Sequence, residues 1–257
     1  MLSEERYREI LNRIKKNGSV TVSAISEELN VSIETVRRDL IFLEAKGHIK
    51  RVFGGAVASK SPLHFEDFSA RLQSHYVQKR AVAEKVAELI NEHDVIALDA
   101  GTTAMVVGEV LKSKFKNLTI IVYSLPLFNL LKDNFNVIIT GGEYYKKEEM
   151  LYGDLAIETV KRLHTNKCFI FPSAISIEHG VEDYVPCAIT LQKELMKYSD
   201  NVFVGADSSK YNNRALMKIC DLNHNHVYIT DSDVNKDIVE AFDRNDYTLL
   251  VSETVNK

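Results

Sequence analysis

The sequence has few of the residues that build disulfide or metal sites. Its 257 residues include only three cysteines, which lie far apart at positions 168, 187 and 220. An odd number without any Cys-x-x-Cys pair argues against a disulfide framework and against a zinc cluster. Among eight histidines only His224 and His226 are close together, and one such pair supplies too few metal ligands. We therefore expect reduced thiols in a cytosolic protein, with no metal site and no cofactor.

Long apolar runs are absent as well. No stretch approaches the roughly 18 apolar residues of a membrane span, and the N-terminus is charged from Glu4 onward. No internal repeat or low-complexity segment interrupts the chain. The missing apolar runs argue against a membrane partner and against a targeting segment. We therefore expect a cytoplasmic location.

Charge is distributed unevenly along a chain of otherwise ordinary composition. Hydrophobic residues make up 45% and charged residues 26%, which is typical of a globular protein. Residues 1–60 carry 11 Lys and Arg against 8 Asp and Glu, and the remainder carries 21 against 28. The first part is therefore +3 and the rest −7. This asymmetry suits a basic nucleic-acid-binding part attached to an acidic body with a different task.

Residues 22–57 have the pattern of a helix, a tight turn, a second helix and a short hairpin. Apolar positions recur at helical spacing on both sides of an interruption at 30–31, namely Ile25, Leu29, Val36, Leu40 and Leu43. Ser32 can cap the second helix and Gly47 can end it. An amphipathic helix at 3–16 would pack on these two. The residues 49–52, followed by Gly54-Gly55, predict a basic β-wing with a glycine turn.

The face of the second helix opposite its apolar stripe carries hydroxyls and guanidiniums. These groups belong to Ser32, Thr35, Arg37 and Arg38. Recognition helices of helix-turn-helix proteins contact base edges from this N-terminal half, and a basic wing, here Lys50 and Arg51, can contact phosphates. The alternative is the solvated face of an ordinary helix, which is the usual role of a charge pair. The complete succession of helices and wing favours double-stranded operator DNA as the partner.

The rest of the chain alternates between strand and helix patterns. Residues 59–75 lose periodicity and include one of only four prolines, which predicts a linker between a winged helix-turn-helix domain at 1–58 and a second domain at 76–257. The alternation in the second domain predicts a mainly parallel α/β sheet with helices on both faces. Expected strands are 95–98, 118–122, 137–140, 168–171, 202–205, 226–230 and 247–251, and expected helices are 77–90, one after Thr103, 127–131, 156–163 and 236–242.

Polar and small residues follow several of these strands. Ligands of open α/β sheets bind beyond the carboxyl ends of the strands. The candidates there are Asp99, Gly101, Thr102, Thr103, Ser124, Gly141, Gly142, Asp207 and Lys210. Their backbone donors, hydroxyls and one cation predict a phosphorylated, polyhydroxylated small molecule as effector. Each turn taken alone is also good capping or turn chemistry.

Four segments carry a family pattern: VSAISEELNVSIETVRRDLIFLEAKGHIKRVFGGAV, LDAGTT, GGE and ADSSKYNNRAL. Together they resemble the DeoR-type bacterial transcriptional repressors over nearly the whole chain. The resemblance implies a C-terminal fold related to ribose-5-phosphate isomerase, which senses phosphorylated sugars or their metabolites and releases DNA on binding. It also implies phosphate contacts at Gly101, Thr102 and Thr103, sugar contacts near Ser124 and Gly142, and polar or charged contacts at Asp207 and Lys210.

Two positions depart from the pattern of many family members. The chain has Tyr123-Ser124 where they carry Asn-Ser, and residues 171–175 replace a Gly-Ala-Asp-Gly-like run. Both departures lie where the far end of a ligand is expected to rest.

The main alternative is an enzyme, a sugar-phosphate isomerase fused to a DNA-binding module. An isomerase needs a carboxylate base and a group that stabilises an enediolate oxygen, and Asp207 with Lys210 could fill these roles. This alternative rests on fold-level analogy alone, so we predict no catalytic residues and a repressor of a sugar-metabolism operon. An architectural DNA-bending protein would not need so large an α/β body. One reading module contacts too few base pairs for genomic specificity, so a homo-oligomer, at least a dimer, is expected.

Overall fold

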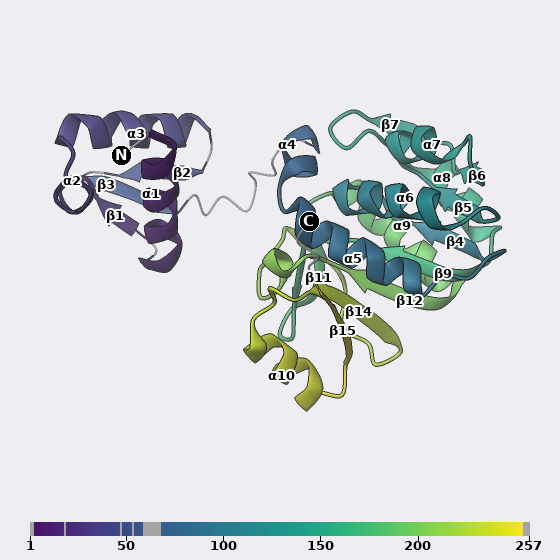
Figure 1. Ribbon diagram of the computed structural model, residues 1–257. Helices are drawn as coiled ribbons and strands as arrows, with labels where there is room; N and C mark the ends of the chain where they lie inside the picture. Colours follow the sequence, from purple (N-terminus) through teal and green to yellow (C-terminus); the bar gives the residue numbers. More distant parts are fainter. Residues whose placement is uncertain (1–2, 18, 47, 53, 59–67, 254–257) are drawn as a thin grey trace. The chain divides into compact units, whose positions relative to one another are not determined.

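The computed structural model describes residues 3–17, 19–46, 48–52, 54–58 and 68–253. The chain divides into two compact units, with the boundary between His64 and Phe65. We call them the N-terminal unit, purple in Figure 1, and the C-terminal unit, which runs from blue-teal to yellow. In the described part of the chain, no helix has both the length and the apolar character needed to cross a membrane.

The N-terminal unit combines helices with a small antiparallel sheet. The chain runs through α1 (Ser3–Asn17), β1 (Ser19–Thr21), α2 (Val22–Glu28), α3 (Ile33–Ala45), β2 (Ile49–Val52) and β3 (Gly55–Ala58). The strand order is β1-β3-β2. The predicted helix-turn-helix and the β2–β3 wing are both present. Strand β1 has no sequence signal, because three residues are too few to show alternation.

The apolar stripes of the helices meet in one core. Its buried residues are Ile10, Ile14, Ile25, Val36, Leu40, Leu43, Ile49 and Ala56. Asn30 adopts a left-handed backbone with φ of 50°, which makes the tight turn between α2 and α3. Gly55 allows β1 and β3 to pair, since a Cβ at that position would lie 2.0 Å from the carbonyl oxygen of Val20. This packing decides which side of α3 faces outward.

A seven-stranded parallel sheet forms the centre of the C-terminal unit. Its strands are β4 (Val95–Leu98), β5 (Thr119–Val122), β6 (Asn136–Ile139), β9 (Thr165–Ile170), β12 (Ser199–Gly205), β14 (His226–Asp231) and β15 (Thr248–Ser252). Their spatial order is β15-β14-β12-β9-β4-β5-β6, and each neighbouring pair is parallel. The order grows outward in both directions from the adjacent strands β4 and β9. The predicted fold class is confirmed, and all seven predicted strands are present.

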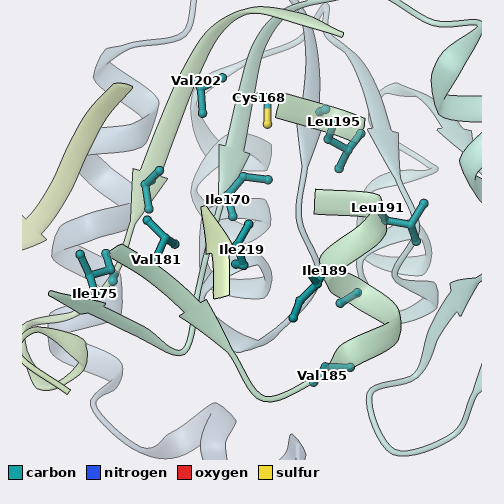
Figure 2. Close-up of a cluster of buried hydrophobic side chains, with 14 of the residues drawn as sticks. Cys168, Ile170, Ile175, Val181, Val185, Ile189, Leu191, Leu195, Val202 and Ile219 are labelled. Atoms are coloured by element: carbon teal, nitrogen blue, oxygen red, sulfur yellow. The ribbon is translucent and has the colours of Figure 1, made fainter. Parts of the chain in front are cut away.

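Helices cover both faces of this sheet, as predicted (Figure 1). One face packs against α5 (Tyr76–Glu88), α6 (Thr102–Lys114) and α7 (Leu125–Leu131), and the other against α8 (Asp154–Lys161) and α9 (Pro186–Lys197). Successive residues of β4 alternate between the two cores, since Ile96 and Leu98 join one and Ala97 joins the other. Figure 2 shows the second core, where side chains from β9, α9 and short strands gather. Helix α10 (Lys236–Arg244) adds Phe242 to it.

Several elements were not predicted from the sequence. They are the antiparallel sheet of β10 (Ala174–Ser176), β11 (Gly180–Asp183) and β13 (Met217–Cys220), the hairpin of β7 (Glu143–Tyr145) and β8 (Met150–Tyr152), the 3-10 turn η1 (Ser208–Lys210), and α9. Short strands that pair over long sequence separations leave no periodic signal. Helix α9 does begin with a recognisable signal, Pro186 in its first turn.

Part of the predicted linker is folded. Helix α4 (Phe68–Gln73) belongs to the C-terminal unit. The ammonium of Lys79 donates hydrogen bonds to the backbone carbonyls of Arg71 and Ser74, and the Arg71 side chain pairs with Glu148. The linker was predicted to extend to residue 75. These contacts explain why it ends earlier. The predicted linker residues 59–67 lie outside the described part of the chain.

Candidate functional site

Two of the predicted DNA contacts lie at the start of α3. Ser32 is its N-cap, and the Ser32 Oγ accepts a hydrogen bond from the backbone N–H of Thr35 at 3.1 Å. The two hydroxyl oxygens are 2.8 Å apart. Ser32 is exposed and Thr35 half-buried. The Ser32 hydroxyl therefore caps the helix. Both hydroxyls lie in its N-terminal half, from which recognition helices contact bases.

The two predicted base-reading arginines point away from the core. The side chains of Arg37 and Arg38 are 62% and 79% exposed, and their nitrogen atoms lie 3.9 and 3.8 Å from carboxylate oxygens of Glu34. Ion pairs this long between exposed side chains contribute little free energy. Both guanidiniums are therefore available to a polyanion.

The residue that follows the arginine pair points inward. The Oδ2 and Oδ1 atoms of Asp39 accept hydrogen bonds from Arg6 Nε at 2.7 Å and Arg6 Nη2 at 3.0 Å. The Asp39 side chain is 5% exposed. This ion pair ties α1 to α3 and was not predicted, although a charge at the helical spacing of Val36 and Leu40 is a usable signal.

The wing residues lie on β2. The backbone N–H and the Nε of Arg51 donate to the two carboxylate oxygens of Glu44 at 2.8 and 2.7 Å. This contact joins the wing to the end of α3 and compensates part of the Arg51 charge. The side chain of Lys50 is outside what the structure describes. Phosphate contacts at Lys50 and Arg51 remain predictions.

In the C-terminal unit, the reversal of strand order marks a second place of interest. Asp99 follows β4 and Phe171 follows the neighbouring β9. In open α/β sheets, ligands bind beyond the carboxyl ends of the strands at such a reversal. A cavity of about 40 Å³ lies here, which we call the crevice. It is lined by Arg71, Asp99, Ala100, Gly101, Tyr123, Glu148, Met150, Phe171, Ser173, Asp183, Val185, Ala188 and Gln192.

The Asp99 carboxylate is held from several sides. Its Oδ1 accepts hydrogen bonds from the backbone N–H of Ala100 at 2.8 Å and from the Tyr123 hydroxyl. Its Oδ2 accepts from the backbone N–H of Phe171 at 2.8 Å and from Gln192 Nε2 at 3.0 Å. Burial raises the pKa of Asp99 to about 6, and the hydrogen bonds from Tyr123 and Phe171 oppose that rise. The carboxyl group is thus fixed between the ends of β4 and β9.

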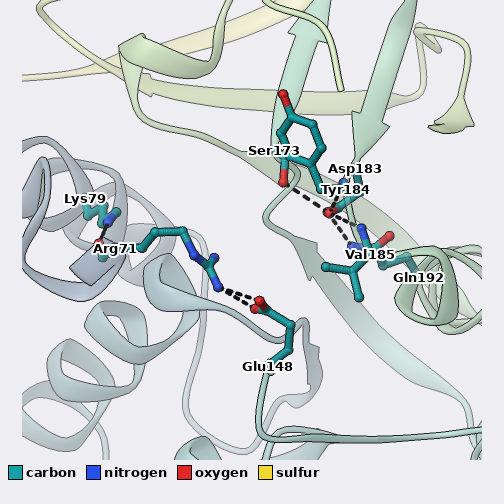
Figure 3. Close-up of polar contacts among 8 residues, drawn as sticks. All are labelled: Arg71, Lys79, Glu148, Ser173, Asp183, Tyr184, Val185 and Gln192. Atoms are coloured by element: carbon teal, nitrogen blue, oxygen red, sulfur yellow. Dashed lines mark hydrogen bonds and ion pairs between the residues drawn. The ribbon is translucent and has the colours of Figure 1, made fainter. Parts of the chain in front are cut away.

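A second buried carboxylate shares the same amide. Gln192 Nε2 also donates to Asp183 Oδ2 at 3.2 Å, and Ser173 Oγ donates to Asp183 Oδ1 at 3.1 Å (Figure 3). Burial raises the pKa of Asp183 as well. Because the amide nitrogen faces two carboxylates, the carbonyl oxygen of Gln192 is directed elsewhere. That oxygen is buried and has no hydrogen-bond partner among the described residues.

Asp183, Gln192 and Ser173 were not among the predicted site residues. Gln192 occupies the buried stripe of α9 together with Leu191 and Leu195, and a polar residue on an apolar stripe is a signal that could have identified it. Asp183 reaches the crevice through the pairing of β11 with β10 and β13, which has no local signature.

An ion pair closes the crevice on another side. Figure 3 shows Arg71, from α4, and Glu148, from the β7–β8 turn, pointing toward one another. Arg71 Nη2 lies 2.7 and 2.5 Å from the two carboxylate oxygens, and the side chains are 15% and 6% exposed. Burial raises the pKa of Glu148, and the Arg71 charge opposes that rise.

Among the predicted effector residues, Asp99 and Gly101 line the crevice. Gly101 has φ of 105° and open space where a Cβ would point, so an anion can approach its backbone. Thr102 and Thr103 form the first turn of α6 and are 6% and 8% exposed. No side chain among the described residues caps α6 at Gly101. The N-terminus of α6 therefore begins beside the crevice.

Three other predicted residues have structural roles. Ser124 is the N-cap of α7, and its hydroxyl accepts from the backbone N–H of Leu127 at 3.4 Å. Gly141 and Gly142 have positive φ values of 75° and 115°. A Cβ on Gly142 would lie 2.3 Å from the carbonyl oxygen of Tyr152. These contacts favour the capping and turn alternatives for the three positions.

Asp207 and Lys210 follow β12 and do not line the crevice. The buried Oδ1 of Asp207 accepts hydrogen bonds from the backbone N–H of Ser209, at 3.1 Å, and from its hydroxyl. Strands β12 and β6 are four strand spacings apart in the sheet, or about 19 Å at about 4.8 Å per spacing. Asp207 and Gly142 thus follow strands that are not neighbours in the sheet.

A larger hollow of about 440 Å³ lies elsewhere, between the β10–β11 hairpin, residues 211–214 and α10. None of the described residues that line it has a buried polar side-chain atom without a hydrogen-bond partner. Gln192, which lines the crevice, does have such an atom, its Oε1. We therefore take the crevice as the candidate site of the C-terminal unit.

Comparison with known families agrees with both halves of this geometry. Residues 6–62 match the DeoR-like helix-turn-helix domain, and residues 74–232 match the DeoR C-terminal sensor domain. The chain belongs to the DeoR family. It is thus a DNA-binding transcriptional regulator, as the family resemblance implied.

Several relatives match over nearly the whole of both chains. The HTH-type transcriptional regulator GolR of Listeria innocua is 32% identical over 244 residues, with 94% of this chain and 96% of that protein covered. The HTH-type transcriptional repressor GlcR of Bacillus subtilis is 31% identical, with 98% of each chain covered. The putative aga operon transcriptional repressor of Escherichia coli O157:H7 is 29% identical, with 93% and 90% covered.

Solved structures are more distant. Ribose-5-phosphate isomerase A of Neisseria gonorrhoeae covers 53% of each chain with 19% identity and a TM-score of 0.37. The enzyme of Methanocaldococcus jannaschii covers 54% of this chain and 55% of its own, with 15% identity and a TM-score of 0.39. The DeoR family assignment rests on the sequence matches and not on these structures.

Proposed function

We propose that this DeoR-family regulator represses a sugar-metabolism operon and that a phosphorylated sugar, bound in the crevice, releases it from operator DNA. The observation that carries the effector half is the buried carbonyl oxygen of Gln192, which has no hydrogen-bond partner among the described residues. Gln192 lines the crevice together with Gly101, where α6 begins without a side-chain cap. A carbonyl oxygen accepts a hydroxyl hydrogen, and a helix N-terminus attracts a phosphate. A sugar phosphate supplies both groups in one molecule.

The regulatory direction draws on the relatives. GlcR is named a repressor, and so are the aga operon protein and a lactose phosphotransferase system protein of Staphylococcus epidermidis. A relative from Haemophilus influenzae is named an L-fucose operon activator. Repression is therefore the role that most of these names support, and two of the names include a sugar, lactose and L-fucose.

In the proposed DNA complex, α3 lies in the major groove. Arg37 and Arg38 contact base edges, Ser32 and Thr35 support them from the first turn, and Lys50 and Arg51 contact phosphates from the wing. Two copies of the chain bind paired half-sites, and the C-terminal unit carries the contacts between them. Sedimentation of the free protein at micromolar concentration checks this, and a monomer both free and on DNA would contradict it.

The experiment that tests the function starts with duplexes selected from a random pool by the full-length protein. Anisotropy of the selected duplex is then measured with glucose 6-phosphate, fructose 6-phosphate, ribose 5-phosphate and their unphosphorylated sugars. At least one phosphorylated sugar should lower DNA affinity by about 5–150-fold, the usual range of allosteric coupling, and the duplex must lower the affinity for that sugar by the same factor. An unphosphorylated sugar that acts as strongly as its phosphate would contradict the proposal.

Catalysis remains the alternative function, and one observation favours it. Two buried carboxylates, Asp99 and Asp183, have raised pKa values in the same crevice, and a carboxylate of this kind is a possible general base. The same pair is also explained by structure alone, because both carboxylates accept hydrogen bonds from backbone N–H groups and from Gln192. A turnover assay on every sugar phosphate that binds decides between them, because an enzyme forms product and a sensor does not.

A further inference from the structure

The crevice is too small for the proposed effector as it stands. Its volume of about 40 Å³ is close to the space of a single water molecule, about 30 Å³. Small-molecule sites usually measure about 300–1,000 Å³. Some part of the wall must therefore move when a sugar phosphate enters.

The parts of the wall differ in how firmly they are held. Asp99 receives four hydrogen bonds from the strand ends, Tyr123 and Gln192. Arg71 and Glu148 come from elements outside the seven-stranded sheet, namely the short helix α4 and the β7–β8 turn. Residues 146, 147 and 149 around Glu148 are exposed. The Arg71–Glu148 side of the crevice is thus the side that can open with the least disturbance of the core.

The charges in the crevice also point to the Arg71–Glu148 pair. Among the described residues, those that line the crevice include three carboxylates, on Asp99, Asp183 and Glu148, and one cationic side chain, Arg71. A phosphate group adds up to two negative charges, so its entry needs a cation. A guanidinium holds phosphate and carboxylate oxygens through the same forked donors. The carboxylate of Glu148 therefore occupies the position on Arg71 that a ligand oxyanion would take.

We propose that Arg71 is the anion-binding residue of the crevice and that Glu148 holds its guanidinium until the anionic group of the effector replaces that carboxylate. This inference rests on the proposed function and extends it, because it names the residue that recognises the phosphate. It also assigns to Arg71 the role that the sequence alone gave to Lys210. In the liganded protein the phosphate lies between Arg71 and the N-terminus of α6 at Gly101, and Glu148 turns out to water.

The replacement of Glu148 by the ligand involves Arg71 on helix α4. Helix α4 is the first described element after the N-terminal unit, and Lys79 holds its last turn through the carbonyls of Arg71 and Ser74. Replacement of the Glu148 carboxylate by the ligand therefore changes the partner of a side chain of α4.

The first arm of the test uses inorganic phosphate as the probe and needs no identified sugar. The full-length protein is heated in phosphate and in sodium chloride of equal ionic strength, and the Tm of the C-terminal unit is measured for wild type and three variants. Glu148→Gln keeps the shape of the side chain and removes its charge, so phosphate should raise its Tm by a few degrees more than that of wild type. In the second variant, Arg71→Gln is added to Glu148→Gln and should abolish this gain. In the third variant, Lys210→Ala is added to Glu148→Gln and should leave the gain intact.

Each result of this arm decides the proposal. No extra gain in Glu148→Gln would overturn it, and so would a gain that survives Arg71→Gln or that disappears with Lys210→Ala. Equal phosphate stabilisation of all four proteins would indicate binding elsewhere on the surface and would overturn it too.

The second arm separates this inference from the proposed function. With whichever sugar phosphate weakens wild-type DNA binding, Arg71→Gln should lose at least tenfold in sugar-phosphate affinity relative to wild type, whereas Lys210→Ala should respond normally. If none of the sugar phosphates acts on wild type, the effector proposal fails while the phosphate arm still decides the role of Arg71. If a sugar phosphate acts equally on Arg71→Gln and wild type, the inference on Arg71 fails and the proposed function stands.

Discussion

The two units of this protein treat charge in opposite ways. In the N-terminal unit, Arg37 and Arg38 are 62% and 79% exposed and make only long contacts to Glu34. In the crevice of the C-terminal unit, Asp99 is 1% exposed, and both members of the Arg71–Glu148 pair are largely buried. Solvated cations suit a long polyanion, whose binding is driven by the release of counterions. A small ligand instead requires fixed, desolvated groups that recognise it individually.

The largest expected effect comes from the one buried charge beside the exposed arginines. Asp39→Ala removes the carboxylate that holds Arg6, and breaking one side of a buried ion pair costs about 3 kcal/mol or more. A unit of about 60 residues has little stability to lose. We expect calorimetry to show the loss of the N-terminal unfolding transition, with DNA binding lost and the C-terminal transition unchanged.

The exposed neighbour Glu34 provides the matched control for Asp39. Glu34→Ala removes the same charge from the same helix and should leave both transitions in place. If Asp39→Ala unfolds like Glu34→Ala, the contrast between buried and exposed charge within α3 is wrong.

The next effect concerns pH and the buried carboxyl of Asp99. Its folded-state pKa of about 6 lies above its ordinary value of 3.8, a difference worth about 3 kcal/mol. The folded state binds this proton more tightly than the unfolded state does. The contribution to stability is therefore present below about pH 4 and is lost as the pH rises to about 6.

Urea unfolding of wild type and Asp99→Asn between pH 4 and 7 isolates this contribution, because the variant lacks the titration. The difference in unfolding free energy between the two proteins should change as the pH rises from about 4 to about 6 and become constant above that pH. Asp133→Asn, at an exposed position, should follow the wild-type profile. A constant difference for Asp99→Asn would mean that the crevice carboxylate is solvated like those at the surface.

A smaller effect is expected for the base-reading arginines. Arg37→Ala and Arg38→Ala should each cost about 1–3 kcal/mol of operator binding and relax the preference at one base position. Neither should change the unfolding transitions, since both side chains are exposed. Anisotropy with the selected duplex and its single-base variants measures both quantities. Arg162→Ala removes an exposed arginine of the C-terminal unit and should bind like wild type, so equal losses in all three would reveal a mere net-charge effect.

The smallest effect distinguishes the two wing residues. Each lost phosphate contact lowers the slope of log affinity against log salt by about 0.9. Lys50→Ala should show nearly this full change, and Arg51→Ala should show less, because Glu44 already compensates part of its charge. A salt titration of the two variants against wild type ranks them. The reverse order would assign the main wing contact to Arg51.

The sequence predicted the fold where a local pattern repeats. The seven strands of the large sheet show as β-rich runs, and the helix-turn-helix shows as apolar spacing interrupted at Asn30. It missed the sheet of β10, β11 and β13, whose strands have three or four residues each. Such strands are defined by their partners, which lie far away in the sequence.

The candidate site was predicted in part for the same reason. Asp99 and Gly101 directly follow a recognisable strand, so their place at the sheet edge could be predicted. Ser124 and Gly142 follow strands too, but their contacts are those of a cap and a turn. A residue after a strand end can serve either role, and only its neighbours in space distinguish them.

The sequence by itself determined the two-part plan of this protein, the outward direction of Arg37 and Arg38, and the sheet edge at which the candidate site lies. Periodicity fixes these features, because apolar side chains must be buried and every other position follows from helix or strand geometry. The tertiary structure decided which polar groups meet at that edge. Four separate elements contribute its polar side chains, Arg71, Glu148, Asp183 and Gln192. Their burial is tolerated because each carboxylate accepts hydrogen bonds there that replace those to water.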